Sequence, residues 1–265
     1  MPKTKAPLDA PTSVGAAYDG PFHVLRERGD SRLLLIGDHA SNALPAEYGA
    51  LGLPAASFSR HIAYDLGIGD LVSAMSEAMA APAILAGFSR LLIDPNRGED
   101  DPTLVMRLSD GEIIPGNAQI DATEKQRRLE AFHRPYHKRI DGALDAAIAA
   151  GIAPLLVSMH SFTPLWRGKV RPWHCGILWS SDRETAEFCL TFLRRAGDLI
   201  VGDNQPYSGE LEGDSMDSHG RRRQVRHVLI EVRQDLIASS EGRGEWVGRL
   251  KPLLEGLMAR ANVKP

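Results

Sequence analysis

Residues 154–162 read Pro-Leu-Leu-Val-Ser-Met-His-Ser-Phe, an apolar run that passes into polar residues at its carboxyl end. The apolar residues of this run do not alternate with polar ones, which is typical of a strand covered on both faces of a sheet. Similar runs occur along the chain at Arg32–Gly37, Ala83–Gly87, Leu91–Asp94, Gly176–Trp179, Leu199–Val201 and His227–Val232. The sequence therefore predicts a buried, mostly parallel sheet.

Helical patterns lie between these runs. Apolar residues recur every three or four positions from Ile62 to Met79 and from Leu129 to Ile148, and two further helices fit Asp182–Arg195 and Gly244–Ala261. Strands that alternate with helices predict an α/β fold of three layers, α/β/α, with a mostly parallel mixed sheet. In such folds the chemistry lies beyond the carboxyl ends of the strands.

The composition of the 265-residue chain excludes several classes of protein. The 31 basic and 34 acidic side chains give a formal net charge of −3, which argues against a nucleic-acid-binding surface. No apolar run reaches the ~20 residues that a membrane-spanning helix needs. Residues 1–20 lack the pattern of a secretory or transit peptide, so we expect a poorly ordered arm, one domain over residues 21–265 and a cytoplasmic location. Cys175 and Cys189 are expected to be reduced.

Polar residues gather where the predicted strands end. His39 follows the first strand and His160 ends a later one. Two histidines from separate strands and one carboxylate would make a three-ligand zinc site with an open fourth position. Asp65 could supply the carboxylate, since it stands four residues after His61 and the two would share one face of the predicted helix. Alternatively, the histidines are merely buried and hydrogen-bonded.

Asn96 and Arg97 suit an anionic group, because arginine offers a planar fork to a carboxylate and asparagine adds a neutral donor. The alternative is an internal salt bridge, since acidic residues follow at 99–101. Arg90 and Arg222 are further cations that could reach the same crevice. By contrast, His133 and His137 lie among Lys and Arg residues, and we interpret them as a solvated helix face.

Six segments, in this order along the chain, together resemble the motifs of the N-formylglutamate amidohydrolase family: Gly37–Asn42 with Leu44-Pro45, His61–Asp65, Ser89–Arg97, Ser158–Phe162, His219-Gly220 and Ile230–Arg233. The resemblance covers most of residues 30–240. It implies an α/β/α fold related to zinc carboxypeptidases and other phosphorylase/hydrolase-like folds. It also implies one zinc ion and hydrolysis of the amide bond of a small anionic N-formyl or other N-acyl amino acid, such as N-formylglutamate.

The resemblance also implies roles for single residues. His39, Asp65 and His160 would hold the zinc ion. Glu231 matches the glutamate that acts as acid and base, and Asn96 and Arg97 match the pair that holds a substrate carboxylate. Beyond the resemblance, we expect Arg90 to stabilise the oxyanion if it faces the crevice, and Asn42, His219 and Arg222 to contact the substrate as well.

Two departures from related motifs keep other activities open. Zinc carboxypeptidases read His-x-x-Glu at the first ligand, where this chain has Asn42 as the fourth residue. Typical family members read His-Ser-Gly, where this chain has His39-Ala40-Ser41, which indicates a side branch. The competing interpretations are a zinc deacylase or peptidase for a larger acyl group and a metal-free anion-binding protein. The sequence leaves self-association open.

Overall fold

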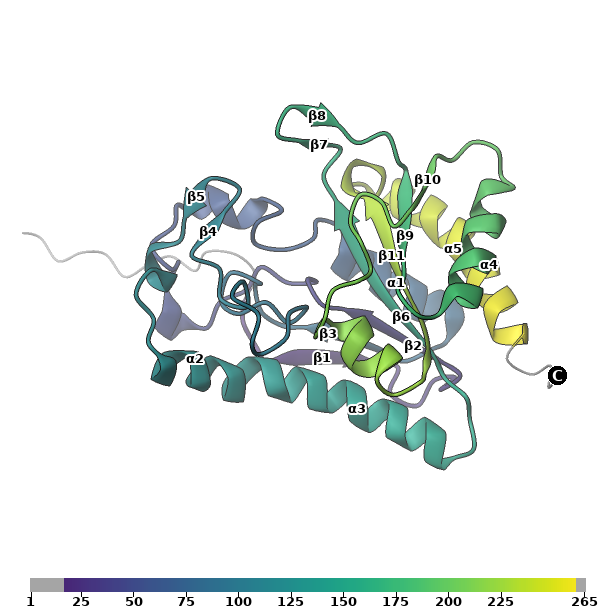
Figure 1. Cartoon of the computed structure of the whole chain (residues 1–265), viewed down its shortest axis with the longest axis horizontal. Helices are drawn as coiled ribbons and strands as arrows, with labels where there is room; N and C mark the ends of the chain where they lie inside the picture. Colours follow the sequence, from purple (N-terminus) through teal and green to yellow (C-terminus); the bar gives the residue numbers. More distant parts are fainter. Residues whose placement is uncertain (1–16, 261–265) are drawn as a thin grey trace, which may run out of the picture.

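The computed structural model describes residues 17–260, and at its centre lies one seven-stranded sheet (Figure 1). From one edge to the other the strands are β1 (Phe22–Leu25), β3 (Ala83–Ala86), β2 (Leu33–Gly37), β6 (Leu155–Phe162), β11 (Arg226–Arg233), β9 (Cys175–Leu178) and β10 (Val201–Asp203). The four strands β3, β2, β6 and β11 are parallel, whereas β1 is antiparallel to β3 and β9 is antiparallel to β11. The predicted mixed, mostly parallel sheet is confirmed.

Helices cover both faces of this sheet (Figure 1). On one face pack α1 (Ile68–Met79), α4 (Arg183–Arg194) and α5 (Ser240–Arg260). On the other face α2 (Ala122–Arg128), a π-helical stretch (Leu129–His133) and α3 (Arg134–Ala149) follow one another as one long helical run.

Successive side chains of a strand point to opposite faces, so each central strand contributes to both apolar layers. In β2, Leu33 and Leu35 pack with the first group of helices, whereas Leu34 and Ile36 pack with the second. Each fully buried side chain of this kind contributes roughly 1.5–3 kcal/mol to folding, and this burial holds the strand ends in place.

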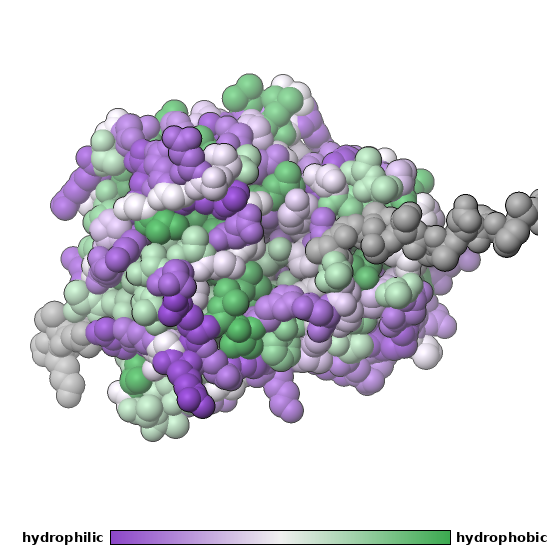
Figure 2. Space-filling view, turned by 180° about the vertical axis from the view of Figure 1, so that it is seen from behind, coloured by the Kyte–Doolittle hydropathy of each residue, from purple (hydrophilic) through white to green (hydrophobic). Residues whose placement is uncertain are grey.

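Short elements rim the carboxyl ends of the parallel strands. Two small hairpins, β4–β5 (Leu108–Ser109 with Glu112–Ile113) and β7–β8 (Leu165–Trp166 with Lys169–Val170), project from the body of the molecule (Figure 1). The remaining elements are 3-10 helices at Ala46–Tyr48, Ala55–Ser59, Pro115–Asn117 and Gln234–Leu236 and a π-helix at Met216–Arg221. Seen from behind, the surface mixes hydrophilic and hydrophobic residues (Figure 2).

Three sequence predictions of local structure were wrong. The helix predicted from Ile62 begins at Ile68, because Gly67 takes a left-handed conformation with φ of 79° immediately before it. His61 and Asp65 therefore lie in turns and share no helix face. The apolar run Leu91–Asp94 is a buried loop, whose backbone amides bond to Ser89 and Leu104 instead of a neighbouring strand. The half-buried edge strand β1 was missed.

Other expectations fall partly or wholly within the described residues. Cys175 and Cys189 are buried and free, as predicted. Within residues 17–260 no helix is long and apolar enough to cross a membrane. Residues 1–16 of the predicted N-terminal arm lie outside the described part of the chain.

Candidate active site

A cavity of about 250 Å³ lies at the carboxyl-terminal ends of the parallel strands. It brings together residues far apart in sequence, and its lining includes His39, Asp65, Arg90, Asn96, Arg97, His160 and Glu231. These seven residues were predicted from the sequence to belong to one site. The structure places them around one cavity.

The imidazoles of His39 and His160 and the carboxylate of Asp65 form a buried cluster whose donor atoms all lie within 4.8 Å of one another. Asp65 Oδ2 is 2.8 Å from His160 Nδ1 and 3.4 Å from His39 Nδ1. Among the described residues, His39 Nδ1 has no hydrogen-bond partner. A buried polar atom without a partner costs roughly 1–3 kcal/mol, and a nitrogen lone pair of this kind is what a metal ion accepts. Two imidazoles and one carboxylate fit zinc.

The other nitrogen of each ring is held by a second carboxylate. His39 Nε2 lies 2.6 Å from Asp94 Oδ1, and His160 Nε2 lies 3.1 Å from Asp38 Oδ2. A carboxylate behind the ring fixes the proton on Nε2 and turns Nδ1 toward the cluster, as in metal-binding histidines generally. The two rings are therefore oriented as metal ligands require.

His160 lies between two carboxylates, Asp38 and Asp65. Burial lowers the pKa of His160, but these two carboxylates outweigh burial and raise that pKa well above its usual value. In turn, burial raises the pKa of Asp65, but the imidazoles of His39 and His160 outweigh it and hold the pKa below its usual range. A cation is thus favoured in this cluster, and without a metal ion the proton of His160 supplies it.

Arg90 lies beside the cluster and balances its acidic residues. Its guanidinium is 2.9 Å from Asp94 Oδ2 and 3.5 Å from Asp65 Oδ1. The Nε–H group of Arg90 is buried and has no hydrogen-bond partner within residues 17–260. Arg90 thus lines the cavity while two carboxylates hold its guanidinium in place.

Glu231 approaches the cluster from the neighbouring strand. In the parallel register Glu231 of β11 pairs with His160 of β6, so both side chains lie on the same face of the sheet. Glu231 is only 5% exposed, and its Oε2 atom has no partner in the described part of the chain. Burial raises the pKa of Glu231 to about 7. A carboxyl group with such a pKa can both accept and donate a proton near neutral pH.

Asn96 and Arg97 form another wall of the cavity. Asn96 Oδ1 accepts a hydrogen bond of 3.0 Å from the Ser215 amide. Arg97 donates to the carbonyl of Asn96 at 2.7 Å, and Asp101 lies 4.0 Å away at the limit of an ion pair. The geometry therefore does not favour the alternative of a strong internal salt bridge between Arg97 and the acidic residues that follow it. Arg97 keeps positive charge to offer to the cavity.

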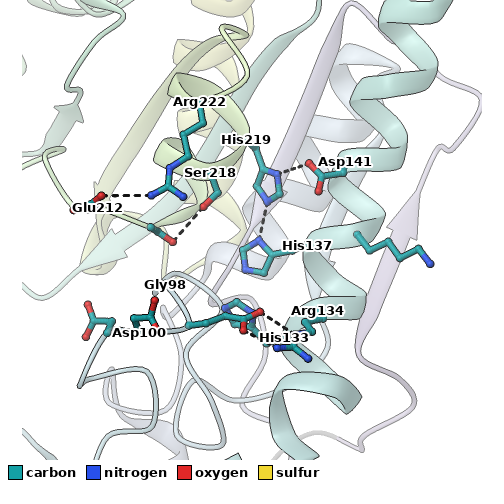
Figure 3. Close-up of a pocket in the computed structure, with 14 residues that line it drawn as sticks. Gly98, Asp100, His133, Arg134, His137, Asp141, Glu212, Ser218, His219 and Arg222 are labelled. Carbon is teal, nitrogen blue, oxygen red and sulfur yellow. Dashed lines mark hydrogen bonds and ion pairs between the residues drawn. The ribbon is translucent and has the colours of Figure 1, made fainter. Parts of the chain in front are cut away.

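Three residues predicted to contact substrate are not among the residues that line this cavity: Asn42, His219 and Arg222. The side-chain amide of Asn42 donates a hydrogen bond of 2.8 Å to the carbonyl of Phe58, in the 3-10 helix Ala55–Ser59. His219 and Arg222 line a separate cavity of about 880 Å³ (Figure 3). His219 lies in the π-helix Met216–Arg221 and contacts His137 and Asp141 of α3, and Arg222 follows this π-helix directly.

The interpretation of His133 and His137 as a solvated helix face is also wrong. His133 is only 5% exposed, and its ring packs against that of His137, tilted by 42° and with 4.2 Å between centroids. His137 Nδ1 lies 2.7 Å from His219 Nε2. The two histidines occupy the inner face of the helical run, while the neighbouring Arg134 and Lys138 are exposed.

Sequence reasoning missed several residues of the site. Asp38 precedes the predicted ligand His39 in sequence and Asp94 lies two residues before Asn96, but their contact with the far side of each ring is visible only in three dimensions. Asp214 lines the cavity, and burial raises its pKa to about 6. Aromatic side chains line the cavity as well: Phe162, Trp166 and Tyr207.

The fold and the cluster define an α/β protein with a candidate metal centre at the carboxyl ends of parallel strands. Residues 31–238 match the family model described as N-formylglutamate amidohydrolase. The chain belongs to this family, which indicates a hydrolase of the amidohydrolase class.

Two solved structures share the fold of this chain. A gene product of Agrobacterium tumefaciens is 32% identical, with 92% of this chain and 95% of that chain covered and a TM-score of 0.86. An N-formylglutamate amidohydrolase from Ralstonia eutropha is 20% identical, with 92% and 98% covered and a TM-score of 0.67, and it supports the fold. A comparison with curated proteins gave no match.

Proposed function

We propose that this protein is a zinc-dependent hydrolase of the amide bond in an N-formyl or other small N-acyl amino acid, such as N-formylglutamate. The observation that carries the proposal is the buried cluster of His39, Asp65 and His160, with one ring nitrogen unpartnered, in the same cavity as Glu231 and Arg97. Membership in the amidohydrolase family supports it.

His39, Asp65 and His160 would hold one zinc ion, the first and third through Nδ1. When bound, zinc supplies a Lewis acid and lowers the pKa of water towards neutrality. Asp38 and Asp94 keep the two imidazoles oriented for this role.

Glu231 is the proposed proton carrier. With a pKa of about 7, its carboxylate is present in quantity at neutral pH and its acid form can be regenerated there. In the proposed reaction Glu231 takes a proton from the attacking water and returns it to the leaving nitrogen of the amide. Its location opposite His160 in the strand register gives it access to the same point in the cavity.

Two arginines would bind different parts of a small anionic substrate. Arg97, with Asn96 beside it, would bind the carboxylate of the amino acid by charge-assisted hydrogen bonds. Arg90 is partly neutralised by Asp94 and Asp65, so it is less suited to a full negative charge. Because it lines the cavity, its guanidinium would instead stabilise charge on the amide oxygen as the bond breaks.

One observation favours a second candidate with the same metal site. Phe162, Trp166 and Tyr207 give the cavity an aromatic wall that a formyl group is too small to cover. This wall favours a zinc-dependent deacylase whose substrate carries a larger apolar acyl group or side chain.

Purified protein loaded with zinc should be assayed with N-formylglutamate, N-formylphenylalanine, N-acetylglutamate and a longer N-acyl glutamate, and the released amino acid measured. Turnover that depends on zinc with any N-formyl substrate supports the proposal, and preference for the longer acyl chain supports the second candidate. Protein that binds no zinc but binds these anions would overturn both in favour of a metal-free anion-binding protein.

A further inference from the structure

A chain of hydrogen bonds runs from the second cavity to the wall of the first (Figure 3). His219 Nδ1 lies 2.9 Å from Asp141 Oδ1, and His219 Nε2 lies 2.7 Å from His137 Nδ1. His137 Nε2 then lies 2.9 Å from the carbonyl oxygen of Pro95, the residue before Asn96. Figure 3 shows the ring of His219 between Asp141 of α3 and the ring of His137.

The protons of this chain can be counted. The Pro95 carbonyl and the Asp141 carboxylate only accept hydrogen bonds, so His137 Nε2 and His219 Nδ1 must each carry a proton. The bond between the rings needs a third proton, whereas two neutral imidazoles carry only two. The two outer bonds thus place one proton on each ring, and a proton between the rings completes the chain.

The surroundings of the two rings set the direction of the outer hydrogen bonds. Burial, together with His133 and His219, lowers the pKa of His137. Burial raises the pKa of Asp141, but His219 and Arg223 together outweigh burial and lower that pKa, which keeps the carboxylate ionised. Arg223 also donates to Asp141, at 2.9 Å. Asp141 and His219 thus fix the direction of every bond, and His137 can only donate toward Pro95.

The chain ends on a segment that is held from both sides. His133 Nε2 lies 2.9 Å from the Arg97 carbonyl, so His133 and His137 bind the two carbonyls that flank Asn96. On the opposite side, the backbone N–H of Asn96 donates a hydrogen bond of 2.9 Å to Asp94 Oδ1. These bonds leave the loop little freedom just where Asn96 and Arg97 face the first cavity.

We propose that His137, held by His219 and Asp141, is a positioning residue that sets where Arg97 meets the substrate carboxylate. The inference rests on the proposed function, in which Arg97 binds that carboxylate. A displacement of a binding group by about 1 Å is enough to weaken its contact severely, so loss of the His137 bond should act on substrate affinity.

Two substitutions of His137 separate hydrogen bonding from packing. His137→Phe keeps a ring between His133 and His219 but makes neither hydrogen bond. His137→Gln can accept from His219 through its oxygen and donate to Pro95 through its nitrogen. We expect His137→Phe to raise KM for N-formylglutamate about tenfold with kcat and zinc content nearly unchanged, and His137→Gln to restore most of the affinity. Lys138→Ala, on the same helix and the same cavity, serves as the control.

A double-mutant cycle with Arg97→Ala shows whether His137 acts through Arg97. If it does, His137→Phe adds almost nothing to KM once Arg97 is removed. Additive effects, a loss in kcat instead of KM, or a Gln variant no better than Phe would overturn the inference. If His137→Phe does not fold, Asp141→Asn, at the exposed end of the chain of hydrogen bonds, should raise KM in the same Arg97-dependent way.

Calorimetric titration of zinc-depleted protein with N-formylglutamate keeps the two proposals distinguishable. Wild-type protein that binds this anion through Arg97 but never hydrolyses it would overturn the proposed reaction and retain the positioning role, provided His137→Phe weakens binding. Active wild-type enzyme whose affinity is insensitive to His137→Phe would overturn only the positioning role.

Discussion

One oxygen of Asp94 accepts from both His39 and Asn96: Asp94 Oδ1 lies 2.6 Å from His39 Nε2 and 2.9 Å from the Asn96 amide nitrogen. The other oxygen of this carboxylate binds Arg90 at 2.9 Å. A single buried side chain thus joins a proposed zinc ligand to the segment proposed to bind the substrate carboxylate.

Asp94→Asn should therefore weaken zinc binding without abolishing it. The amide keeps an acceptor for His39 but loses the negative charge that strengthens the ring as a ligand, so we expect a 10- to 100-fold loss of zinc affinity. Competition with a chelator of known affinity measures the change. Asp101→Asn, on the same loop but outside the first cavity, is the control. Equal affinities for wild type and Asp94→Asn would show that the contact does not tune the metal.

The proposed ligands make a stronger prediction. His39→Ala and His160→Ala should each lose stoichiometric zinc, and Asp65→Asn should weaken binding because an amide is a poor zinc ligand. His61→Ala should retain zinc, since His61 lies outside the cluster of His39, Asp65 and His160. Elemental analysis of the four purified variants decides the ligand set. Zinc retained in Asp65→Asn but lost in His61→Ala would exchange the roles of these two residues.

Glu231→Gln should separate turnover from binding. Glutamine preserves the size and hydrogen bonding of the side chain but cannot accept a proton from water, so kcat should fall by about 10²–10⁴-fold with zinc content and KM little changed. Steady-state kinetics and a thermal melt should be recorded together. A lowered melting temperature with kcat intact would make Glu231 a residue of the sheet framework only.

Asp214 allows a prediction about stability and pH. Burial raises its pKa to about 6, above the ~3.9 expected in the unfolded chain, so the folded state holds the proton more tightly. The free energy of unfolding therefore falls as the pH rises from about 4 through 6. Above that range the full cost of the buried, ionised Asp214 is present. Asp214→Asn removes the buried charge and can still accept from the Asp217 amide, so it should stabilise the fold by about 1–3 kcal/mol at pH 8 and little at pH 4.

Urea unfolding of wild type and Asp214→Asn at the two pH values tests this prediction. Asp217→Asn provides a control of opposite sign. Burial raises the pKa of Asp217, but Arg221 and the Gly213 amide outweigh burial and lower it. Asp217→Asn should therefore destabilise the protein at pH 8. An Asp214→Asn variant that is less stable than wild type at pH 8 would contradict the assignment of a buried charge penalty.

The sheet was predictable because burial on both faces leaves continuous apolar runs in β2, β3, β6 and β11, and the strand ends located His39, His160 and Glu231. Predictions failed where buried apolar residues lie in irregular backbone. Ile62 and Leu91 are as well buried as strand or helix residues, but the hydrogen bonds of their loops come from distant segments that a local pattern cannot contain. The expected place of His219 beside the substrate was unpredictable for another reason, since only the folded chain shows which of two neighbouring cavities the side chain lines.

The alternation along β6 has a consequence for how this protein tolerates genetic change. Val157 and Met159 belong to an apolar layer, whereas Ser158 and His160 bond to Asp38 on the opposite face. In saturation mutagenesis of residues 157–160, we thus expect tolerance to alternate along the strand. Positions 157 and 159 should accept other apolar residues, whereas positions 158 and 160 should accept almost no substitution. Insertion of one codon upstream in the strand would shift the register by one residue and turn each side chain to the other face of the sheet. His160 would then lie in the apolar layer, and the site would be lost although no functional residue is replaced.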